Sequence, residues 1–177
     1  DIISTSNIPW ASILSLLAKL NSKKVVFVSS SPQIRYPDCY GIDMSKMNQF
    51  VAFRALIKLI KDRKMENSID ETYEACKKSL NNNKPINHVK TLYDMFSYDD
   101  ISNYVAKIVK PKEMKSQFQI IYQNIDNLNK ACPNHLGDWY FTGNYPTLGG
   151  NLVANRSFIN FFVVMQKDAL VLIALSL

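Results

Sequence analysis

Two short apolar runs rich in β-branched residues stand out from the helical periodicity that dominates the chain. The first covers Val25 to Val28, and the second covers residues 117–123. A helical pattern over residues 10–20, with Ile13, Leu16, Leu17 and Leu20 on one apolar face, precedes the first run. A helix followed closely by a buried strand is half of a parallel βαβ unit. The pattern therefore predicts an α/β fold with parallel strands near residues 24–29 and 117–123.

Amphipathic helical patterns follow the first predicted strand. One helix is expected from an N-cap at Ser45 to about residue 64, with an apolar face of aromatic and branched side chains. A second helix is expected from Ser68, which forms a capping-box pattern with Glu71, to about residue 80. The first of these helices, together with that of residues 10–20, is expected to pack on the sheet, and the second belongs to an inserted helical group.

The same interval holds two more predicted helices. Residues 87–95 form one helical stretch, and Ser97 and Asp100 form a cap-like pair ahead of the next helix. Pro111 stops that helix because it cannot continue the hydrogen-bond ladder. The pattern predicts a helical group that ends just before the second strand.

Three segments follow the second predicted strand. Residues 124–131 are predicted to form a short helix, and the glycine- and aromatic-rich segment 132–155 is predicted to be an ordered loop. The almost wholly apolar residues Ala169 to Leu177 favour a buried strand or a short helix. They cover about half the length that a membrane-spanning helix needs, so no membrane partner is expected.

Composition and charge narrow the function classes without naming one. The 177 residues are 47% apolar and 20% charged, as in an ordinary soluble domain. The net charge of +6 is spread along the chain without an aromatic-interleaved basic patch, so a nucleic-acid partner is not expected. The three sparse cysteines and the lack of a signal-peptide pattern favour a reduced, cytoplasmic location. The first residue is not Met, which favours a piece of a longer protein.

Candidate chemistry is sparse when the residues are taken by themselves. No Walker, Rossmann, GxSxG, HExxH or CxxC motif is present. Cys132 and His135 have the spacing of two metal ligands, although a packed loop is favoured because completing ligands are not evident. His88 is interpreted as a surface or capping residue. Asp38 and Asp43 follow a predicted strand, where α/β sheets bind ligands, but turn formation is the favoured interpretation of the residues by themselves.

Two segments carry a resemblance to a known family. Residues 29–54 and 140–147 match in order and type the stretches found near the end of amidophosphoribosyltransferases. The matching positions in the first segment are Ser31, Pro32, Ile34, Arg35, Pro37 and Tyr40 through Met44. The second segment, Tyr140 to Thr147, is similar to a Phe-Thr-Gly-x-Tyr-Pro-Thr pattern.

The resemblance implies a partial phosphoribosyltransferase-type (type I) parallel sheet with flanking helices and an inserted helical group. Residues 1–65 would form the C-terminal portion of the phosphoribosyltransferase core, and residues 66–115 the inserted helical segment. Residues 116–162 would hold the last core strand, a short helix and an ordered loop. Residues 163–177 form an apolar tail outside the resemblance.

The resemblance also implies where a phosphoribosyl pyrophosphate (PRPP) site would lie. The family's phosphate loop aligns with residues 1–8, where Asp1 would contact Mg²⁺ and the ribose. Thr5, Ser6 and Asn7 occupy further positions of this loop, which departs from the family pattern because it lacks the glycine that lets a phosphate approach the backbone. No residue is assigned a catalytic role.

A second set of expected residues belongs to the family-signature loop. Its members are taken as recognition features rather than catalytic groups: Arg35, Tyr40, Gly41 and Asp43. Some family members hold an iron–sulfur cluster, whose cysteine positions correspond here to Asp38, Gly137 and Tyr140. None of these is cysteine, so no cluster is expected.

The function implied is that of a fragment. The family forms 5-phosphoribosylamine from PRPP and glutamine-derived ammonia in the first step of de novo purine synthesis, with Mg²⁺, and its partners include PRPP and purine nucleotides. Without the N-terminal glutaminase domain the isolated chain is expected to be inactive. The alternative is a non-catalytic phosphoribosyltransferase-like relic that binds a nucleotide or a partner. A half-sheet leaves an exposed edge and an apolar face, which favours association into a homo-oligomer.

Overall fold

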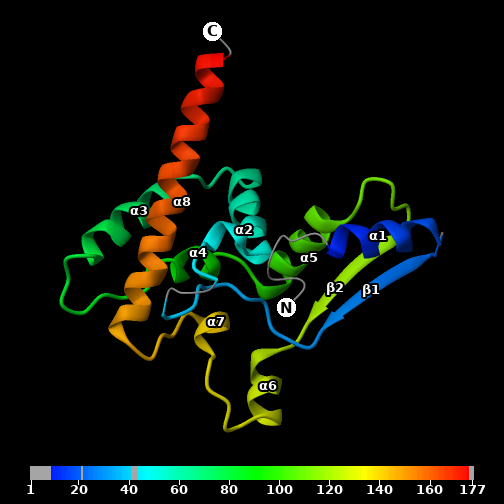
Figure 1. Cartoon of the computed structure of the whole chain (residues 1–177), viewed down its shortest axis with the longest axis horizontal. Helices are drawn as coiled ribbons and strands as arrows, with labels where there is room; N and C mark the ends of the chain where they lie inside the picture. The colour runs from blue at the N-terminus through cyan, green and yellow to red at the C-terminus, as the bar shows by residue number, and fades with distance from the viewer. Residues whose placement is uncertain (1–8, 21, 41–43, 176–177) are drawn as a thin grey trace.

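The computed structural model describes residues 9–20, 22–40 and 44–175, and it has a small parallel sheet at one end and a group of helices at the other (Figure 1). The last helix runs up through the helical group and projects beyond it. In chain order the elements are α1 (Pro9–Lys19), β1 (Lys24–Ser29), the 3₁₀ turn η1 (Met47–Gln49), α2 (Val51–Asp62), α3 (Asn67–Ser79), α4 (Lys90–Asp94), α5 (Tyr98–Val109), β2 (Gln117–Tyr122), α6 (Ile125–Ala131), α7 (Trp139–Thr142) and α8 (Leu148–Leu175).

Strands β1 and β2 pair in parallel, which confirms the predicted α/β arrangement with flanking helices. The register runs from Lys24 opposite Gln117 to Ser29 opposite Tyr122. One face packs on the helical core through Phe27 and its neighbour on β2, Phe118, whose ring centroids lie 5.8 Å apart.

The other face of the sheet carries exposed apolar side chains. They are Val26, Val28 and Ile121, and Val28 is 73% exposed to solvent. Alternation along a strand sends successive side chains to opposite faces, so covering one face leaves these residues in solvent. The expected apolar sheet face is therefore confirmed among the described residues.

Helix α1 forms where the sequence predicts it but uses a different residue for packing. Leu14 is buried, whereas Ile13, Leu16 and Leu20 on the predicted apolar face are exposed. Ser15 on this helix donates a hydrogen bond to Glu113, just before β2. The periodicity correctly predicted a helix, but the face expected to be buried is mostly exposed, with only Leu17 partly buried.

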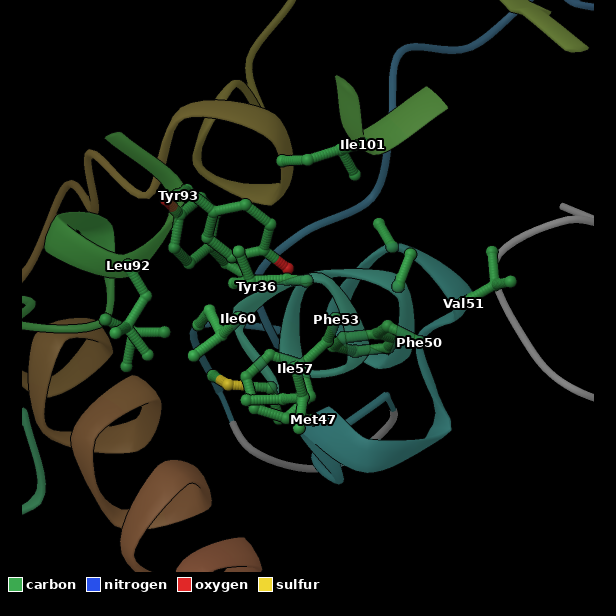
Figure 2. Packing of buried hydrophobic residues seen from close by; sticks show 14 of the residues in the cluster. Tyr36, Met47, Phe50, Val51, Phe53, Ile57, Ile60, Leu92, Tyr93 and Ile101 are labelled. Atoms are coloured by element: carbon green, nitrogen blue, oxygen red, sulfur yellow. The ribbon is translucent and has the colours of Figure 1, made fainter. Parts of the chain in front are cut away.

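The hydrophobic core is centred on α2, whose side chains are covered on most sides (Figure 2). Helices α3, α4, α5 and α8 surround it and contribute buried side chains such as Leu92 and Ile101. The ring of Phe53 meets Phe158 at 6.1 Å and Phe161 at 4.9 Å, both edge to face. Edge-to-face packing places the positive edge of one ring on the negative face of the other. The core thus joins the middle of the chain to its last helix.

The two helix caps predicted at Ser45 and Ser68 are wrong. The segment before α2 is held by α8 instead, since Ser157 accepts a hydrogen bond from the backbone N–H of Met47 and donates one to the Ser45 carbonyl. Helix α2 consequently begins at Val51, after an extended Phe50 that makes no side-chain cap.

Helix α3 begins without the predicted capping box. Glu66 occupies the N-cap position in a helical conformation, and Ser68 donates its hydroxyl to the Met65 carbonyl at 2.7 Å. Ser97 does cap α5 as predicted: its hydroxyl accepts from the Asp100 N–H at 3.0 Å while the Asp100 carboxylate accepts from the Ser97 N–H. A cap is formed only where the preceding chain is extended.

The prediction of a loop from 132 to 155 is wrong in two places. Residues Trp139–Thr142 form α7, and α8 begins at Leu148 and continues without a break to Leu175. The start of α8 was not predicted because it contains Gly149 and Gly150, and glycine disfavours a helix. A Cβ atom at Gly150 would lie 2.5 Å from the Tyr145 ring, so close packing explains this glycine.

The predicted separate strand or short helix at the chain's end is also wrong, since residues 169–175 continue α8. Among the described residues, no helix has the combined length and apolar character that a membrane crossing requires.

Removing the Phe158 ring tests the coupling between α2 and α8. Phe158→Ala is expected to lower the free energy of unfolding by about 3–5 kcal/mol, because it leaves a cavity in the centre of the core. Urea unfolding followed by circular dichroism measures this change. Leu136→Ala is the control, since this leucine is 93% exposed and its truncation is expected to change stability by at most about 0.5 kcal/mol. Equal effects of the two substitutions would contradict the assigned core.

Candidate functional site at the carboxyl ends of the strands

The carboxyl ends of β1 and β2 are joined by one tyrosine on α5. The Tyr98 hydroxyl accepts a hydrogen bond from the Gln33 N–H at 2.8 Å and donates to the Gln123 carbonyl at 3.3 Å. Gln33 follows β1 and Gln123 follows β2. Because the Ser97 cap fixes where α5 begins, it also fixes Tyr98 between the two loops.

The side chain of Gln33 is fully buried and holds this junction from the other side. Its amide nitrogen donates to the Tyr98 carbonyl at 3.0 Å and to the Ser102 hydroxyl at 2.7 Å. Its amide oxygen accepts from Arg35 Nε at 3.0 Å. Buried amide groups that are fully hydrogen-bonded fix a single loop conformation.

Arg35 lies between two aromatic rings. Its guanidinium carbon is 4.9 Å from the centroid of Tyr93 and 4.8 Å from that of Tyr98, within the range of cation–π contact. No carboxylate of the described residues forms an ion pair with it. The Arg35 side chain is thus held by the two ring faces and by the Gln33 side-chain oxygen.

Burial keeps these tyrosines neutral despite the nearby cation. It raises the pKa of Tyr98 and raises that of Tyr93 well above its usual range, and the charge of Arg35 opposes both shifts without overcoming them. The hydroxyls therefore act as hydrogen-bonding groups. Tyr93 donates its hydroxyl to the Arg35 carbonyl at 3.1 Å.

The two segments that carry the family resemblance meet at this site. The Tyr140 carbonyl accepts hydrogen bonds from the backbone N–H groups of Arg35 at 2.8 Å and Tyr36 at 3.1 Å. The Tyr140 hydroxyl donates to Asp38 at 2.9 Å, and the Tyr145 hydroxyl donates to the Pro37 carbonyl at 2.7 Å. Four hydrogen bonds thus bind the loop after β1 to the segment around α7.

Gly143 allows this contact to be close. Its φ of 71° is left-handed, and a Cβ atom there would lie 2.8 Å from Tyr36 Cζ and 2.7 Å from the amide nitrogen of Asn87. The same amide donates to the Gly143 carbonyl at 3.2 Å. Tyr36 in turn packs on Tyr93, with ring centroids 5.2 Å apart. Glycine is required at this position both by backbone conformation and by space.

The segment between α6 and α7 is held by a small polar cluster. His135 Nε2 lies 2.6 Å from the Asn129 side-chain oxygen and 3.1 Å from Asp138 Oδ1, and the Asn129 amide donates to Asp138 Oδ2 at 3.3 Å. Cys132 is exposed and contributes its carbonyl to the His135 N–H. Among the described residues no group of histidines, cysteines and carboxylates could hold a metal ion. These contacts favour the packed-loop interpretation of Cys132 and His135.

His88 is fixed through its backbone at the start of α4. Its N–H donates to the Asn155 side chain at 3.1 Å, and its carbonyl accepts from the Thr91 hydroxyl at 2.7 Å. Burial lowers the pKa of its imidazole. His88 therefore contributes to the helix start, as expected.

Most of the expected site residues cannot be placed. Asp1, Thr5, Ser6, Asn7, Gly41 and Asp43 lie outside the described residues. Of the other two, Arg35 lies between the rings of Tyr93 and Tyr98. Tyr40 is 77% exposed, and its backbone N–H donates to the Asp38 carboxylate at 3.3 Å.

Sequence reasoning missed the groups that organise the site, namely Gln33, Tyr93 and Tyr98. Only Tyr98 had a signal in the sequence, because it follows the predicted cap at Ser97. Gln33 and Tyr93 acquire their roles through residues distant in the chain, which no local pattern reveals.

The geometry joins loops and does not activate a nucleophile. The Cys39 thiol has its pKa raised, chiefly by burial and then by Asp38, so it stays protonated near neutral pH. Burial and the bond to Asp38 raise the pKa of Tyr140 to about 12. Neither group is prepared for acid–base or nucleophilic work at neutral pH.

The contact between Tyr140 and Asp38 can be measured with a double-mutant cycle. Tyr140→Phe and Asp38→Ala are each expected to cost about 1 kcal/mol of stability, and the double variant less than the sum of the two costs, since each removes the same hydrogen bond. Urea unfolding supplies the three values. Strictly additive costs would show that the two side chains are not coupled.

The pH dependence of unfolding gives an independent check of the same contact. The pKa of Tyr140 is about 12 in the folded chain and 10.0 in a free tyrosine, so its contribution is complete below pH 10 and is lost as pH rises towards 12. Tyr140→Phe is therefore expected to lose less stability than the parent chain over this interval. The other buried tyrosines are common to both proteins and cancel in the difference.

Two glycine substitutions separate the close contact from a general effect of adding a methyl group. Gly143→Ala is expected to cost about 1–3 kcal/mol, through left-handed strain and the collision with Tyr36. Gly149→Ala is the control, because the nearest atom to its Cβ is 3.8 Å away in a helix. It is expected to leave thermal stability unchanged or higher. A harmless Gly143→Ala would contradict the assigned packing.

Comparison with curated proteins gives two short similarities. A segment of 41 residues is 42% identical to the amidophosphoribosyltransferase of Pasteurella multocida and 39% identical to that of Haemophilus influenzae. The segment covers 23% of this chain and 8% of each relative, so the similarity extends over less than a tenth of their length. No protein-family profile matches the chain, and no solved structure matches it. Over that segment the comparison supports a relation to amidophosphoribosyltransferases.

Proposed function

We propose that this chain derives from the phosphoribosyltransferase part of an amidophosphoribosyltransferase. The similarity to two such enzymes over 41 residues is the observation that carries the proposal. The parallel pairing of β1 and β2 agrees with it, because a phosphoribosyltransferase of this type has a parallel sheet. The meeting of the two resembling segments at the carboxyl ends of the strands adds a second, independent agreement.

A third agreement comes from the positions that carry cluster cysteines in some family members. Ligands of one iron–sulfur cluster must lie close together in space. Here the two corresponding positions that are distant in sequence are neighbours: the Tyr140 hydroxyl donates to Asp38 at 2.9 Å. A shared architecture would produce this convergence even after the cysteines were replaced. We propose that a direct hydrogen bond here joins segments that the cluster joins in those relatives.

Within this proposal the chain contributes a scaffold to the reaction of the whole enzyme. That reaction combines PRPP with glutamine-derived ammonia to give 5-phosphoribosylamine and pyrophosphate, in the cytoplasm. Mg²⁺ would neutralise the charge of the pyrophosphate. The phosphate-binding loop would contain Asp1, Thr5, Ser6 and Asn7. The tyrosine-bound loops orient the carboxyl edge of the sheet, which is where ligands bind in open α/β folds.

A release assay tests the fragment interpretation. The purified chain, given PRPP, Mg²⁺ and ammonia, is expected to release no pyrophosphate above the rate without protein. The physical reason is that the family places its glutaminase domain and its pyrophosphate-binding segments upstream of the region resembled here. A curated relative assayed under the same conditions is the positive control. Sustained release by the purified chain would overturn the proposal.

The second candidate function, a non-catalytic module that binds a nucleotide or partner, has one observation in its favour. At the carboxyl edge the tyrosine hydroxyls all make hydrogen bonds within the chain, namely those of Tyr93, Tyr98, Tyr140 and Tyr145. These groups hold the loops together, which agrees with the non-catalytic part of this candidate. Calorimetric titration with PRPP and with AMP distinguishes the candidates. Mg²⁺-dependent PRPP binding that Asp1→Asn weakens would support an intact phosphate loop, and AMP binding without PRPP binding would support the module.

A further inference from the structure

A hollow of about 710 Å³, the α3 hollow, lies between α3 and the segment that leads from α3 to α4. Figure 1 shows this segment turning back after α3 and running below it to α4. The helix contributes lining residues such as Glu71 and Ala75, and the segment contributes others such as Lys84 and Ile86. Ligand sites commonly have volumes of about 300–1,000 Å³. The α3 hollow is therefore large enough to hold a ligand.

A buried hydroxyl group without a partner lines this hollow at the end of α3. Ser79 is 4% exposed. Its carbonyl accepts the Asn82 N–H at 3.2 Å, but its hydroxyl has no hydrogen-bond partner among residues 9–20, 22–40 and 44–175. On α5, by contrast, Ser102 donates its hydroxyl to the carbonyl four residues earlier at 3.0 Å. Buried polar groups normally have partners, because leaving them unpaired costs free energy. The Ser79 hydroxyl is thus available to a group from outside the chain.

Two more uncharged polar groups line the α3 hollow. The His88 imidazole has no hydrogen-bond partner in the described part of the chain, since this residue is held through its backbone. Burial lowers the pKa of the imidazole, so at neutral pH it is uncharged and offers one donor and one acceptor. The Asn82 side-chain oxygen accepts the Lys84 N–H at 3.0 Å, which leaves its amide nitrogen as a donor. Such a mixture of donors and acceptors suits the N–H and carbonyl groups of a peptide backbone.

The charged residues of the α3 hollow are separated along the helix. Asp70 and Glu71 lie towards the start of α3, Lys78 lies in its last turn, and Lys84 lies on the following segment. None of these four forms an ion pair with another described residue. Glu74, between them, already has a lysine partner at 3.4 Å. The hollow is therefore negative towards one end and positive towards the other.

The distance between the opposite charges limits the size of the ligand. Glu71 and Lys78 are seven positions apart, which corresponds to about 10 Å along a helix. In a single α-amino acid only one carbon atom separates the ammonium group from the carboxylate, so it cannot reach both ends. An extended peptide gains about 3.3 Å per residue, so about three residues span the same distance.

We propose that the α3 hollow binds the last three residues of an extended peptide, with a cationic group beside Asp70 and Glu71 and the C-terminal carboxylate beside Lys78 and Lys84. The Ser79 hydroxyl then forms a hydrogen bond with the peptide backbone. The inference is independent of the proposed function, because α3 and the segment after it lie outside residues 29–54 and 140–147, which carry the family resemblance.

Calorimetric titration of the full chain with the tripeptide Lys-Ala-Ala tests the proposal. We expect saturable binding with a dissociation constant of about 1 mM or lower. Binding is expected to weaken as salt is added, because the charges are exposed. The tripeptide amide, which lacks the carboxylate, and acetyl-Ala-Ala-Ala, which lacks the cationic groups, are each expected to bind at least about threefold more weakly.

An acetylated form of the same tripeptide distinguishes two sources of the ligand. Acetyl-Lys-Ala-Ala keeps the lysine cation and the carboxylate but has no free N-terminus. Binding equal to that of Lys-Ala-Ala would identify the C-terminus of a longer chain as the ligand. Weaker but saturable binding would identify a free oligopeptide.

Ser79→Ala separates a binding role from a structural one. It is expected to raise the dissociation constant of Lys-Ala-Ala about fivefold, because the peptide loses a hydrogen bond. Thermal stability, followed by circular dichroism, is expected to stay the same or rise, because the hydroxyl has no partner in the chain and alanine favours a helix. Ser68→Ala is the matched control: Ser68 is on the same helix but outside the hollow, and its hydroxyl donates to the Met65 carbonyl at 2.7 Å. It is expected to leave binding unchanged.

The charged ends are tested by removing one charge at a time. Glu71→Gln and Lys78→Gln are each expected to raise the dissociation constant about twofold to fivefold, since exposed charge pairs contribute modestly. Glu66→Gln is the control for Glu71→Gln, because Glu66 is exposed at the start of the same helix and does not line the hollow.

Any one of three results shows that the proposal is wrong. The first is the absence of saturable binding of Lys-Ala-Ala up to about 20 mM. The second is equal binding of Lys-Ala-Ala and its amide, because the lysines would then not hold a carboxylate. The third is a dissociation constant that Ser79→Ala leaves unchanged, because the buried hydroxyl would then not contact the peptide.

Discussion

The carbonyl group of Tyr140 accepts two backbone hydrogen bonds from the loop that leaves β1, and the organisation of the candidate site depends on this contact. It brings together two parts of the chain that are far apart in sequence. Gly143 lets the later segment approach, because only a residue without a side chain fits against Tyr36 in a left-handed conformation. Tyr36 packs on Tyr93, and Tyr93 returns a hydrogen bond to the Arg35 carbonyl. The site is thus a closed set of contacts in which each member positions the next.

The same contacts connect the sheet to the helical core. Tyr98 begins α5 and joins the ends of both strands, while α5 also packs against α2. Helix α8 supports α2 from the opposite end of the chain through Phe158 and Phe161. The core thus connects the last helix, through α2 and α5, to the ends of the strands.

The short sequence similarity and the structure address different aspects of ancestry. The aligned segment covers 23% of the chain and relates it to amidophosphoribosyltransferases there. The structure shows that the loop after β1 meets the segment around α7, since the Tyr140 hydroxyl donates to Asp38. A direct hydrogen bond between side chains requires no cofactor and keeps two segments in the same relation.

Local patterns were sufficient for the features that depend on local physics. Both strands, their parallel pairing and the Ser97 cap follow from periodicity, a close helix–strand connection and an extended residue before a helix. Tertiary contacts decided the rest. The Ser45 carbonyl accepts a hydrogen bond from Ser157 in place of the predicted cap, and a glycine stands at position 150 in the first turn of α8, where the Tyr145 ring leaves no room for a side chain. Propensity is worth about 1 kcal/mol per residue at most for such positions, and packing against distant parts of the chain outweighs it.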